Sequence, residues 1–329
     1  MIGERLAFSL AFALVTALPG VVSGAQGWEP TQNIEIIAAS GPGGAIDLTA
    51  RLIQNLLKQQ KPLSVTTSVL NKPGGGHSIG YAYLNQTPGD GHHVLVTSAN
   101  LITNYIAGTS KIRYGDISPI ALLYNEYTVF CVSVDSPVKS AKDLIALLNA
   151  SPEMLSVGVG SAIAGANAVS VGLVTKLLGG DPKKLKIVAF KSSTEATTAL
   201  IGGHISLVVT SPGIVGPAIK NGRVRPLVLA APKRLGGDFA RVPTWRELGS
   251  NVVVGNWRIL IGPGGLKEEQ LDFWDKIMGT VTATATWLEE LERRAAVPEY
   301  LNSRDTKRFL EEQDALFRDV FMELGIAKK

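Results

Sequence analysis

The sequence predicts an α/β protein of two lobes, each a mostly parallel sheet flanked by helices. Apolar strand-like runs alternate with segments of helical periodicity from residue 33 to about residue 265. Such alternation is typical of parallel sheets that carry helices on their faces. The chain has 329 residues, of which 45% are hydrophobic, and this length suits about two domains with sizeable cores.

The first 25 residues have the pattern of a secretory signal peptide and take no part in the predicted fold. Arg5 precedes an apolar stretch over residues 6–18, and Ser23-Gly24-Ala25 supplies the small residues of a cleavage site. The apolar stretch is too short to span a membrane comfortably, and no later segment approaches the required length. We therefore expect cleavage after Ala25 and export of a soluble mature chain.

Charge and cysteine content exclude several classes of protein. Lysine and arginine are scattered in runs no longer than a pair, so the net charge of +4 indicates a solvated surface and no nucleic-acid partner. The chain has one cysteine, Cys131, which allows no internal disulfide. Because Cys131 lies in an apolar strand-like run, we expect it to be a small buried residue.

Strand-like runs follow one another along the chain, separated by helical segments with clear ends. Strands are expected just after residue 33 and at residues 64–70, 93–97, 127–134, 155–159, 185–190, 205–210, 224–230 and 257–261. Ser140 and Thr244 are each followed three residues later by an acid, a pattern that caps the start of a helix. Gly202-Gly203 and Asn221-Gly222 are typical of helix ends, because they tolerate a left-handed backbone.

From Leu266 onward the pattern is helical only. Apolar residues recur at helical spacing along the last segment, at Phe309, Leu310, Leu316, Phe317, Phe321 and Leu324. We expect the last helix to pack this stripe on the body of the protein as its closing element.

Three glycine-rich segments lie where a strand-like run passes into a helix. They are residues 41–44 (GPGG), 71–78 (NKPGGGHS) and 158–167 (GVGSAIAGAN). A helix N-terminus presents unpaired N–H groups and the positive end of the helix dipole, so it can hold an anion. Each segment alone is also consistent with an ordinary turn. Since ligands of open α/β sheets lie at the carboxyl ends of strands, we expect the three to converge on one site.

No catalytic or cofactor motif accompanies these loops. Ile46 stands where a dinucleotide fingerprint has its third glycine, and no G-x-S-x-G motif surrounds Ser161. His92 and His93 would point to opposite faces of a strand and so form no ordinary metal site. We therefore expect no enzyme, cofactor or metal. A hydrolase or transferase that uses Ser161 or Lys191 stays open as an alternative.

The order of the motifs resembles a known family. A signal peptide is followed by GPGGAIDLTAR, NKPGGGHSIG, TPGDGHHVLVTS, VAFKSSTEATTALIGGHISLVVTSPG, NGRVRPLVLAAPKR and VPTWRELG. This order resembles the extracytoplasmic receptors of tripartite tricarboxylate transporters, the TctC or Bug family, over nearly the whole mature chain. The resemblance implies a type II periplasmic-binding-protein fold, in which two α/β lobes joined by two crossover strands close like a Venus flytrap.

The resemblance also implies a function and its partners. It implies a monomeric solute-binding protein of the periplasm that captures a small organic carboxylate and delivers it to integral-membrane transporter subunits. Lobe 1 would comprise residues 26–125 and 226–329, and lobe 2 residues 126–225. A ligand-sensing receptor for a membrane kinase, with the same fold, stays open as an alternative.

Motif by motif, the resemblance implies a set of ligand-binding residues. The first-lobe loop would contribute Ser40, Gly43, Gly44, Ala45 and Asp47, the opposing loop Gly160, Ser161 and Ala162, and the cleft between them Ser98, Lys191, Thr194 and Ser211. Main-chain amides and ordered waters hold the carboxylate in such receptors, which agrees with the lack of an obvious arginine clamp. For Asp47, stabilisation of the helix N-terminus is an equal alternative.

The chain departs from the family pattern at two places. Ala45 and Ile46 replace a glycine and a hydroxyl residue that are common before the acid, and Ala168 replaces a frequent histidine. Both changes remove polar contacts, so we expect a less polar mono- or dicarboxylate rather than citrate. The sequence leaves open whether His77 or Asn167 contacts the ligand.

Overall fold

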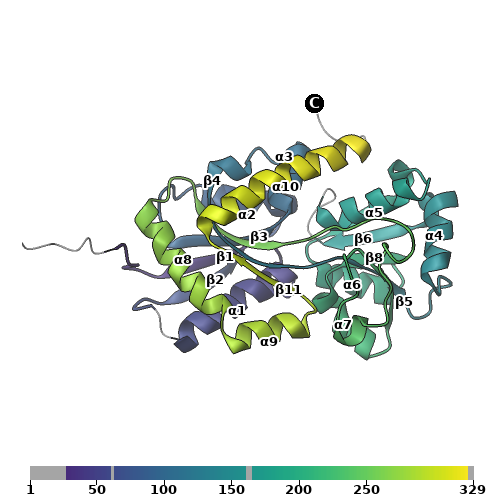
Figure 1. Ribbon diagram of the computed structural model, residues 1–329, viewed down its shortest axis with the longest axis horizontal. Helices are drawn as coiled ribbons and strands as arrows, with labels where there is room; N and C mark the ends of the chain where they lie inside the picture. The colour runs from purple at the N-terminus through teal and green to yellow at the C-terminus, as the bar shows by residue number, and fades with distance from the viewer. Residues whose placement is uncertain (1–26, 61–62, 161–164, 325–329) are drawn as a thin grey trace, which may run out of the picture.

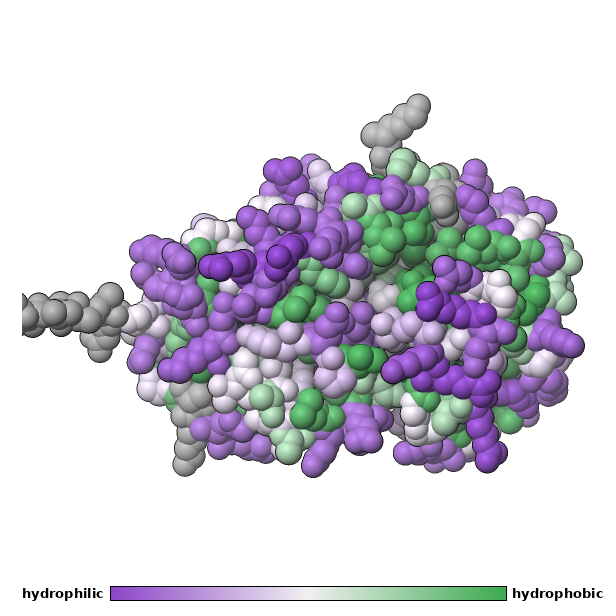
Figure 2. All heavy atoms as spheres, viewed as in Figure 1, coloured by the Kyte–Doolittle hydropathy of each residue, from purple (hydrophilic) through white to green (hydrophobic). Residues whose placement is uncertain are grey.

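The computed structural model describes residues 27–60, 63–160 and 165–324, and it has two lobes, each built around one sheet (Figure 1). The predicted signal peptide lies outside the described residues. On the face drawn in Figure 2, hydrophilic residues cover much of the first lobe, and hydrophobic residues gather on the upper part of the second. The two-lobed α/β fold that the sequence predicts is confirmed.

The first lobe carries a six-stranded sheet. Its strands are β1 (Ile34–Ala38), β2 (Thr67–Asn71), β3 (His93–Ser98), β4 (Ile117–Asn125), β10 (Arg258–Pro263) and β11 (Val297–Leu301). Its helices are α1 (Ala45–Gln60), α2 (Ser78–Leu84), α3 (Asn100–Ile106), α8 (Glu268–Thr282), α9 (Ala285–Arg293) and α10 (Ser303–Leu324). The strand order is β11-β4-β10-β3-β1-β2.

The second lobe carries a five-stranded sheet. Its strands are β5 (Val129–Ser133), β6 (Ser156–Gly160), β7 (Lys186–Phe190), β8 (Leu207–Thr210) and β9 (Val224–Leu229). Its helices are α4 (Ala141–Ala150), α5 (Ala166–Leu177), α6 (Ser193–Ile201) and α7 (Pro212–Lys220). The strand order is β7-β6-β8-β5-β9.

Both sheets are mixed, whereas the sequence predicted mostly parallel sheets. In the first lobe β1 pairs parallel with β2 and β3, but β10 runs antiparallel to β3 and β4. In the second lobe β6 pairs parallel with β7 and β8, but β5 runs antiparallel to β8 and β9. The reason is that β5 and β10 enter their sheets from the opposite lobe, without the crossover helix that a parallel neighbour requires.

Strand periodicity divides the first lobe into two cores. Successive residues of a strand point to opposite faces, so Ile36 and Ile37 in β1 belong to different apolar clusters. The cluster that contains Ile37 is covered by α2, α3 and α10, and the one that contains Ile36 is covered by α1, α8 and α9 (Figure 1). Helices thus cover both faces of the sheet, and its loops stay free at the strand ends.

The chain passes between the lobes twice. It goes directly from β4 to β5 through residues 126–128, and it returns from β9 to β10 through residues 230–257. The predicted limit at residues 125/126 falls between β4 and β5, and the limit at 225/226 falls inside β9. The lobe limits themselves stay a prediction.

The C-terminal region corrects one expectation and confirms another. Strand β11 interrupts the all-helical region predicted from Leu266 onward, and it pairs antiparallel with β4 at the edge of the sheet. Helix α10 does pack on the body, since Leu310, Phe317 and Phe321 are buried, although Leu316 is half-exposed. It reaches from β4 in the first lobe to α5 in the second (Figure 1).

Local signals for helix ends are confirmed with one exception. Ser140 and Asp143 form the predicted pair of capping hydrogen bonds at the start of α4. The same two bonds join Thr244 and Glu247, at 3.3 Å for Glu247 N–H to Thr244 Oγ1 and 2.8 Å for Thr244 N–H to Glu247 Oε2. The predicted helix is nevertheless wrong, because the chain turns away at Gly249, whose φ of 87° is left-handed.

Several properties of the described residues bear on the class of the protein. Cys131 in β5 is fully buried, as expected, and burial raises the pKa of its thiol. None of the described helices is long and apolar enough to cross a membrane. Residues 27–60, 63–160 and 165–324 contain no cluster of histidine, cysteine and carboxylate side chains that could hold a metal ion.

A substitution at Gly180, just after α5, tests the packing of this segment against α4. A Cβ at this position would lie 1.9 Å from the carbonyl oxygen of Leu148, a backbone atom that cannot move aside cheaply. Gly180→Ala is therefore expected to lower the free energy of unfolding by roughly 1–3 kcal/mol, measured by urea unfolding. The control is Gly279→Ala in α8, whose Cβ would meet its nearest neighbour at an ordinary 3.5 Å. Equal effects of the two substitutions would contradict the packing argument.

Candidate functional site

A pocket lies between the lobes, where the N-termini of three helices meet. The first lobe lines it with Ser40, Gly44, Ala45, Ile46, His77, Ser98, Asn100 and Arg258. The second lobe and the connection before β10 line it with Gly160, Gly165, Ala166, Asn167, Ser192, Ser193 and Asn256. The helix N-termini are those of α1, α5 and α6, so N–H groups without intrahelical acceptors surround the pocket.

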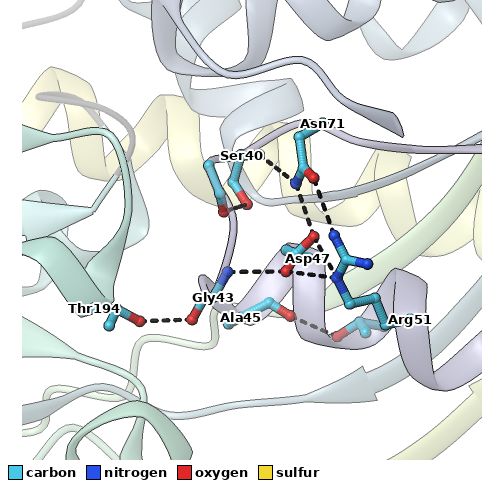
Figure 3. Close-up of polar contacts among 9 residues, drawn as sticks. Ser40, Gly43, Ala45, Asp47, Arg51, Asn71 and Thr194 are labelled. Carbon is cyan, nitrogen blue, oxygen red and sulfur yellow. Dashed lines mark hydrogen bonds and ion pairs between the residues drawn. The ribbon is translucent and has the colours of Figure 1, made fainter. Parts of the chain in front are cut away.

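The side chain of Asp47, in the first turn of α1, holds the loop before this helix through hydrogen bonds (Figure 3). Its Oδ2 accepts hydrogen bonds from the Gly43 N–H at 2.9 Å and from Arg51 Nε at 3.0 Å. Its Oδ1 accepts one from Asn71 Nδ2 at 2.8 Å, and Asn71 Nδ2 also lies 3.0 Å from the carbonyl oxygen of Ser40. Asp47 is 2% exposed and lies outside the pocket lining. The carboxylate thus holds the loop in shape through hydrogen bonds within the first lobe.

The pKa of the Asp47 carboxyl reflects this role. Burial by itself raises the pKa, but hydrogen bonds from Arg51, the Gly43 N–H and Asn71, with the positive charge of Arg51, outweigh burial and lower the pKa below its ordinary value. Asp47 is therefore ionised at neutral pH. Its charge lies near the N-terminus of α1, where the helix dipole favours an anion.

Contacts across the cleft join the loop to the second lobe. The Gly41 N–H lies 3.4 Å from the Lys191 carbonyl oxygen, and Thr194 Oγ1 donates to the Gly43 carbonyl oxygen at 2.6 Å (Figure 3). A Cβ on Gly44 would lie 3.2 Å from the Cβ of Ser192. The lobes are therefore closed against each other at this edge, and Lys191 takes part through its main chain.

Gly160 brings the end of β6 against the N-terminus of α6. A Cβ on Gly160 would lie 2.3 Å from Ser193 Oγ and 2.7 Å from the Ser193 nitrogen, so only glycine allows this approach. The side-chain oxygen of Ser192, the N-cap residue, accepts a hydrogen bond from the Glu195 N–H. The end of β6 and the start of α6 thereby form one wall of the pocket.

His77 is the one residue of the second glycine segment that reaches the pocket. Asn100 Nδ2 donates to its Nε2 at 3.2 Å, which leaves the proton on Nδ1, 3.0 Å from Thr97 Oγ1. Burial, and then the positive charge of Arg258, lower the pKa of His77 from 6.5 to about 3. At neutral pH the pocket therefore contains a neutral imidazole.

A buried ion pair connects the two crossings between the lobes. Glu126, in the first crossing, and Arg258, at the start of β10, lie 2.5 Å apart from Oε2 to Nη2, and both side chains are at most 3% exposed. Ser211 Oγ, at the N-cap of α7, donates to the same Glu126 oxygen at 2.5 Å. The Asn256 N–H donates to the Glu126 carbonyl oxygen at 2.7 Å. First lobe, second lobe and both crossings thus meet at one glutamate.

The ten expected site residues that the structure describes fall into two groups. Five line the pocket: Ser40, Gly44, Ala45, Ser98 and Gly160. Five others lie around it in the contacts described above: Gly43, Asp47, Lys191, Thr194 and Ser211. Ser161 and Ala162 lie outside the described residues. His77 and Asn167, which the sequence left open, both line the pocket.

The sequence did not reveal that a charged side chain lines the pocket. It indicated no arginine clamp, whereas Arg258 lines the pocket. The available signal was a lone arginine at the head of the apolar run RILIGP, and a second was Glu126 close to the apolar stretch that begins at Tyr127. A charge that enters a buried strand requires a partner, but the sequence does not say which of the distant acids supplies it.

Comparisons with known proteins agree on one family. The family model described as "Tripartite tricarboxylate transporter family receptor" matches residues 49–326. A UPF0065 protein of Bordetella bronchiseptica is 25% identical over 327 residues, which cover 98% of this chain and 95% of that protein.

Solved structures of similar proteins have the same fold. R. palustris Rpa4515, solved with adipate, superposes with a TM-score of 0.83 at 23% identity, covering 91% of this chain and 99% of its own. MatC (Rpa3494) from Rhodopseudomonas palustris, solved with bound malate, gives a TM-score of 0.78 at 21% identity, covering 88% and 99%. These likenesses confirm the two-lobed binding-protein fold.

The buried neutral state of His77 predicts a dependence of stability on pH. Below about pH 6.5 the unfolded chain binds a proton at this residue, whereas the folded chain does not until pH falls to about 3. The free energy of unfolding should therefore decrease as pH falls, by up to about 1.4 kcal/mol per pH unit from this residue alone.

Urea unfolding between about pH 7 and pH 5 of the wild type and of His77→Asn measures this contribution. Asparagine does not titrate, and it tolerates the left-handed φ of 86° at this position. The wild type should lose stability relative to the variant as pH falls. Parallel curves would show that His77 takes up a proton in the folded state.

Proposed function

The chain belongs to the tripartite tricarboxylate transporter receptor family, and from this premise we propose that it is a periplasmic receptor that captures a small organic carboxylate between its lobes and delivers it to the membrane subunits of such a transporter. One observation carries the proposal: the N-termini of α1, α5 and α6 converge on a single pocket between the lobes. The adipate and malate in the structures of Rpa4515 and MatC support a carboxylate as the ligand class.

Helix N-termini are suited to hold a carboxylate without a cation dedicated to it. Ala45 and Ile46 in α1, and Ala166 and Asn167 in α5, present first-turn N–H groups beside the pocket. These groups replace the hydration shell of the anion, and the dipoles add a favourable potential. Each charge-assisted hydrogen bond contributes about 1.5–3 kcal/mol, so a few suffice for micromolar affinity after the cost of association.

Closure links binding to recognition by the transporter. The contacts of Gly41 with Lys191 and of Thr194 with Gly43 form only when the lobes meet. A carboxylate that bridges both walls binds the closed form more tightly than the open form and so shifts the population toward it. The membrane subunits would then recognise the closed form.

We expect binding without turnover. His77 is neutral and hydrogen-bonded at both ring nitrogens, and both Asp47 oxygens are hydrogen-bonded to neighbouring residues, with Asp47 outside the pocket lining. Ser98 Oγ accepts from the Asn100 N–H at 3.4 Å, and the hydrogen bonds of the His77 ring go to Thr97 and Asn100 instead of to Ser98. The described part of the pocket thus offers donors and shape, as a receptor needs, and lacks the activated nucleophile that a hydrolase needs.

A melting assay with a panel of mono- and dicarboxylates, adipate and malate included, tests the proposal. At a concentration of about 100 Kd, a true ligand should raise the free energy of unfolding by about 2.7 kcal/mol. Methyl esters of the same acids are the controls, because they lack the anion. Mass spectrometry should find the ligand unchanged. A panel without any stabilising acid, or formation of a product, would contradict the receptor function.

Gly44→Val tests whether closure depends on the loop before α1. The added side chain would crowd Ser192 across the cleft, and also Ser40 and Gly41 within its own loop, so ligand-induced stabilisation should be lost, with a smaller loss of stability in the unliganded protein. Gly236→Val is the control, since a Cβ on this exposed glycine would meet no atom within 4 Å and its φ is not left-handed. Normal carboxylate affinity in Gly44→Val, measured by calorimetry, would count against this loop as part of the site.

A further inference from the structure

We propose that the outer edge of strand β7 is a docking site for an extended, acidic segment of a partner protein, which adds to the second-lobe sheet as a further strand. Strand β7 lies at one end of that sheet, so one side of its backbone pairs with β6 and the other side has no neighbouring strand. This surface lies outside the pocket lining, and the proposal therefore goes beyond ligand binding.

The backbone of β7 directs alternate residues toward β6 and away from it. The Lys186 N–H lies 3.4 Å from the carbonyl oxygen of Leu155, just before β6, and the parallel register then continues without a shift to Phe190. The residues between those that pair with β6 turn their N–H and C=O groups outward. Ile187 and Ala189 therefore present both kinds of group along the free edge, without a hydrogen-bond partner among the described residues.

The edge is accessible and regular. Val188 is 38% exposed, and Lys186 and Ala189 are exposed as well, so side chains on both faces of the strand reach the surface. The strand contains no proline and no bulge. Strand addition requires these properties, because the incoming segment must stay in register over several residues.

The other sheet edges in the described part of the chain are protected. Strand β9 carries Pro226 and strand β11 carries Pro298, and a proline offers no N–H to an incoming strand. Beside β2, Gln54 Nε2 of α1 donates to the Thr67 carbonyl oxygen at 2.8 Å and so occupies an acceptor of that edge. Within residues 27–60, 63–160 and 165–324, β7 is thus the sheet edge that has neither form of protection.

The charge beside the edge indicates an acidic partner. Residues 181–195 carry four lysines and two acids, namely Lys183, Lys184, Lys186, Lys191, Asp181 and Glu195. The four lysines are exposed. Both acids already accept a backbone N–H, at 3.0 Å from Lys183 for Asp181 and at 2.9 Å from Lys191 for Glu195. Carboxylates on an incoming strand would therefore meet an excess of positive charge.

The same lysines disfavour a second copy of this chain as the partner. Pairing of two β7 edges would bring the lysines of both copies together, and like charges oppose such pairing. An anionic membrane surface would use the positive charge but not the row of backbone N–H and C=O groups. An extended acidic segment uses both.

The edge ends at a contact that closes the lobes. The Lys191 carbonyl oxygen, directly after β7, accepts from the Gly41 N–H of the first lobe at 3.4 Å, and Ser192 and Ser193 line the pocket. A segment that follows β7 to its end would therefore lie beside the junction of the lobes. In a receptor that delivers its ligand to membrane subunits, the segment would belong to one of those subunits, and this last step rests on the proposed function.

Amide hydrogen exchange, followed by NMR with and without a probe peptide, tests the inference on the mature wild-type protein. The probe is a short blocked peptide in which valine alternates with glutamate. The control peptides carry lysine in place of glutamate, or proline in place of every second valine. The glutamate peptide should bind at least about tenfold more tightly than either control and slow exchange of the Ile187 and Ala189 amides at least about tenfold. The Val188 amide, which faces β6, is the internal reference.

Three outcomes would overturn the inference. They are equal binding of all three peptides or of none, slower exchange elsewhere with Ile187 and Ala189 unchanged, and binding to phosphatidylglycerol vesicles without binding to the glutamate peptide. The last would assign the lysines to a lipid surface. None of these measurements uses a carboxylate ligand, so failure here leaves the melting assay of the proposed function unaffected.

Ala189→Pro tests the backbone of the edge. It removes an outward N–H from an edge strand, where proline is tolerated, and should lower the affinity for the glutamate peptide at least about tenfold. Ala189→Thr keeps the N–H at the same exposed position and is the control. Unchanged affinity in Ala189→Pro would overturn strand addition. The exchange data on the wild type decide the inference even if Ala189→Pro folds poorly.

Lys186→Glu tests the charge of the edge. It should lower the affinity for the glutamate peptide about tenfold and reduce the dependence of binding on salt. Lys276→Glu, at an exposed position in α8 of the first lobe, makes the same change of charge away from β7 and should leave the affinity within about twofold (Figure 1). Equal effects of the two substitutions would overturn the assignment of an acidic partner to this edge.

Discussion

The ion pair between Glu126 and Arg258 is the contact on which the arrangement of the two lobes depends. Both charges are almost fully buried, so each needs the other, and removal of one partner from such a pair costs about 3–5 kcal/mol. The pair lies where the chain crosses between the lobes, and Ser211 adds the start of α7. Because Arg258 also lines the pocket, the contact that joins the crossings orients one wall of the ligand site.

A second carboxylate, with a different task, organises the loop before α1 in the first-lobe lining of the pocket. Asp47 holds the loop before α1 through Gly43, Arg51 and Asn71, and this shape directs the first-turn N–H groups of α1 toward the pocket. The acid therefore acts through the backbone that it positions. Cleft closure uses the same loop, because the Gly43 carbonyl oxygen accepts from Thr194 of the other lobe. Loop shape, anion binding and closure are thus properties of one short segment.

These features give the pocket an electrostatic character suited to a single anionic group. Three helix N-termini contribute partial positive charge, the Arg258 charge is balanced by Glu126, and His77 is kept neutral by burial and by that same arginine. Fixed dipoles hold an anion without a large desolvation cost for the empty site, whereas an unpaired buried cation would be expensive.

The sequence by itself determined the features that arise within a few residues. The alternation of strands and helices, the capping pair at Ser140 and the left-handed glycines 203 and 222 could all be predicted, because each depends on neighbours along the chain. Tertiary structure decided the rest. Thr244 makes its capping bonds without a helix, β11 pairs at an edge that no local signal marks, and Arg258 finds its partner 132 positions away. Packing of distant segments determines which buried charges and polar atoms meet, so the walls of the pocket become visible only in the folded chain.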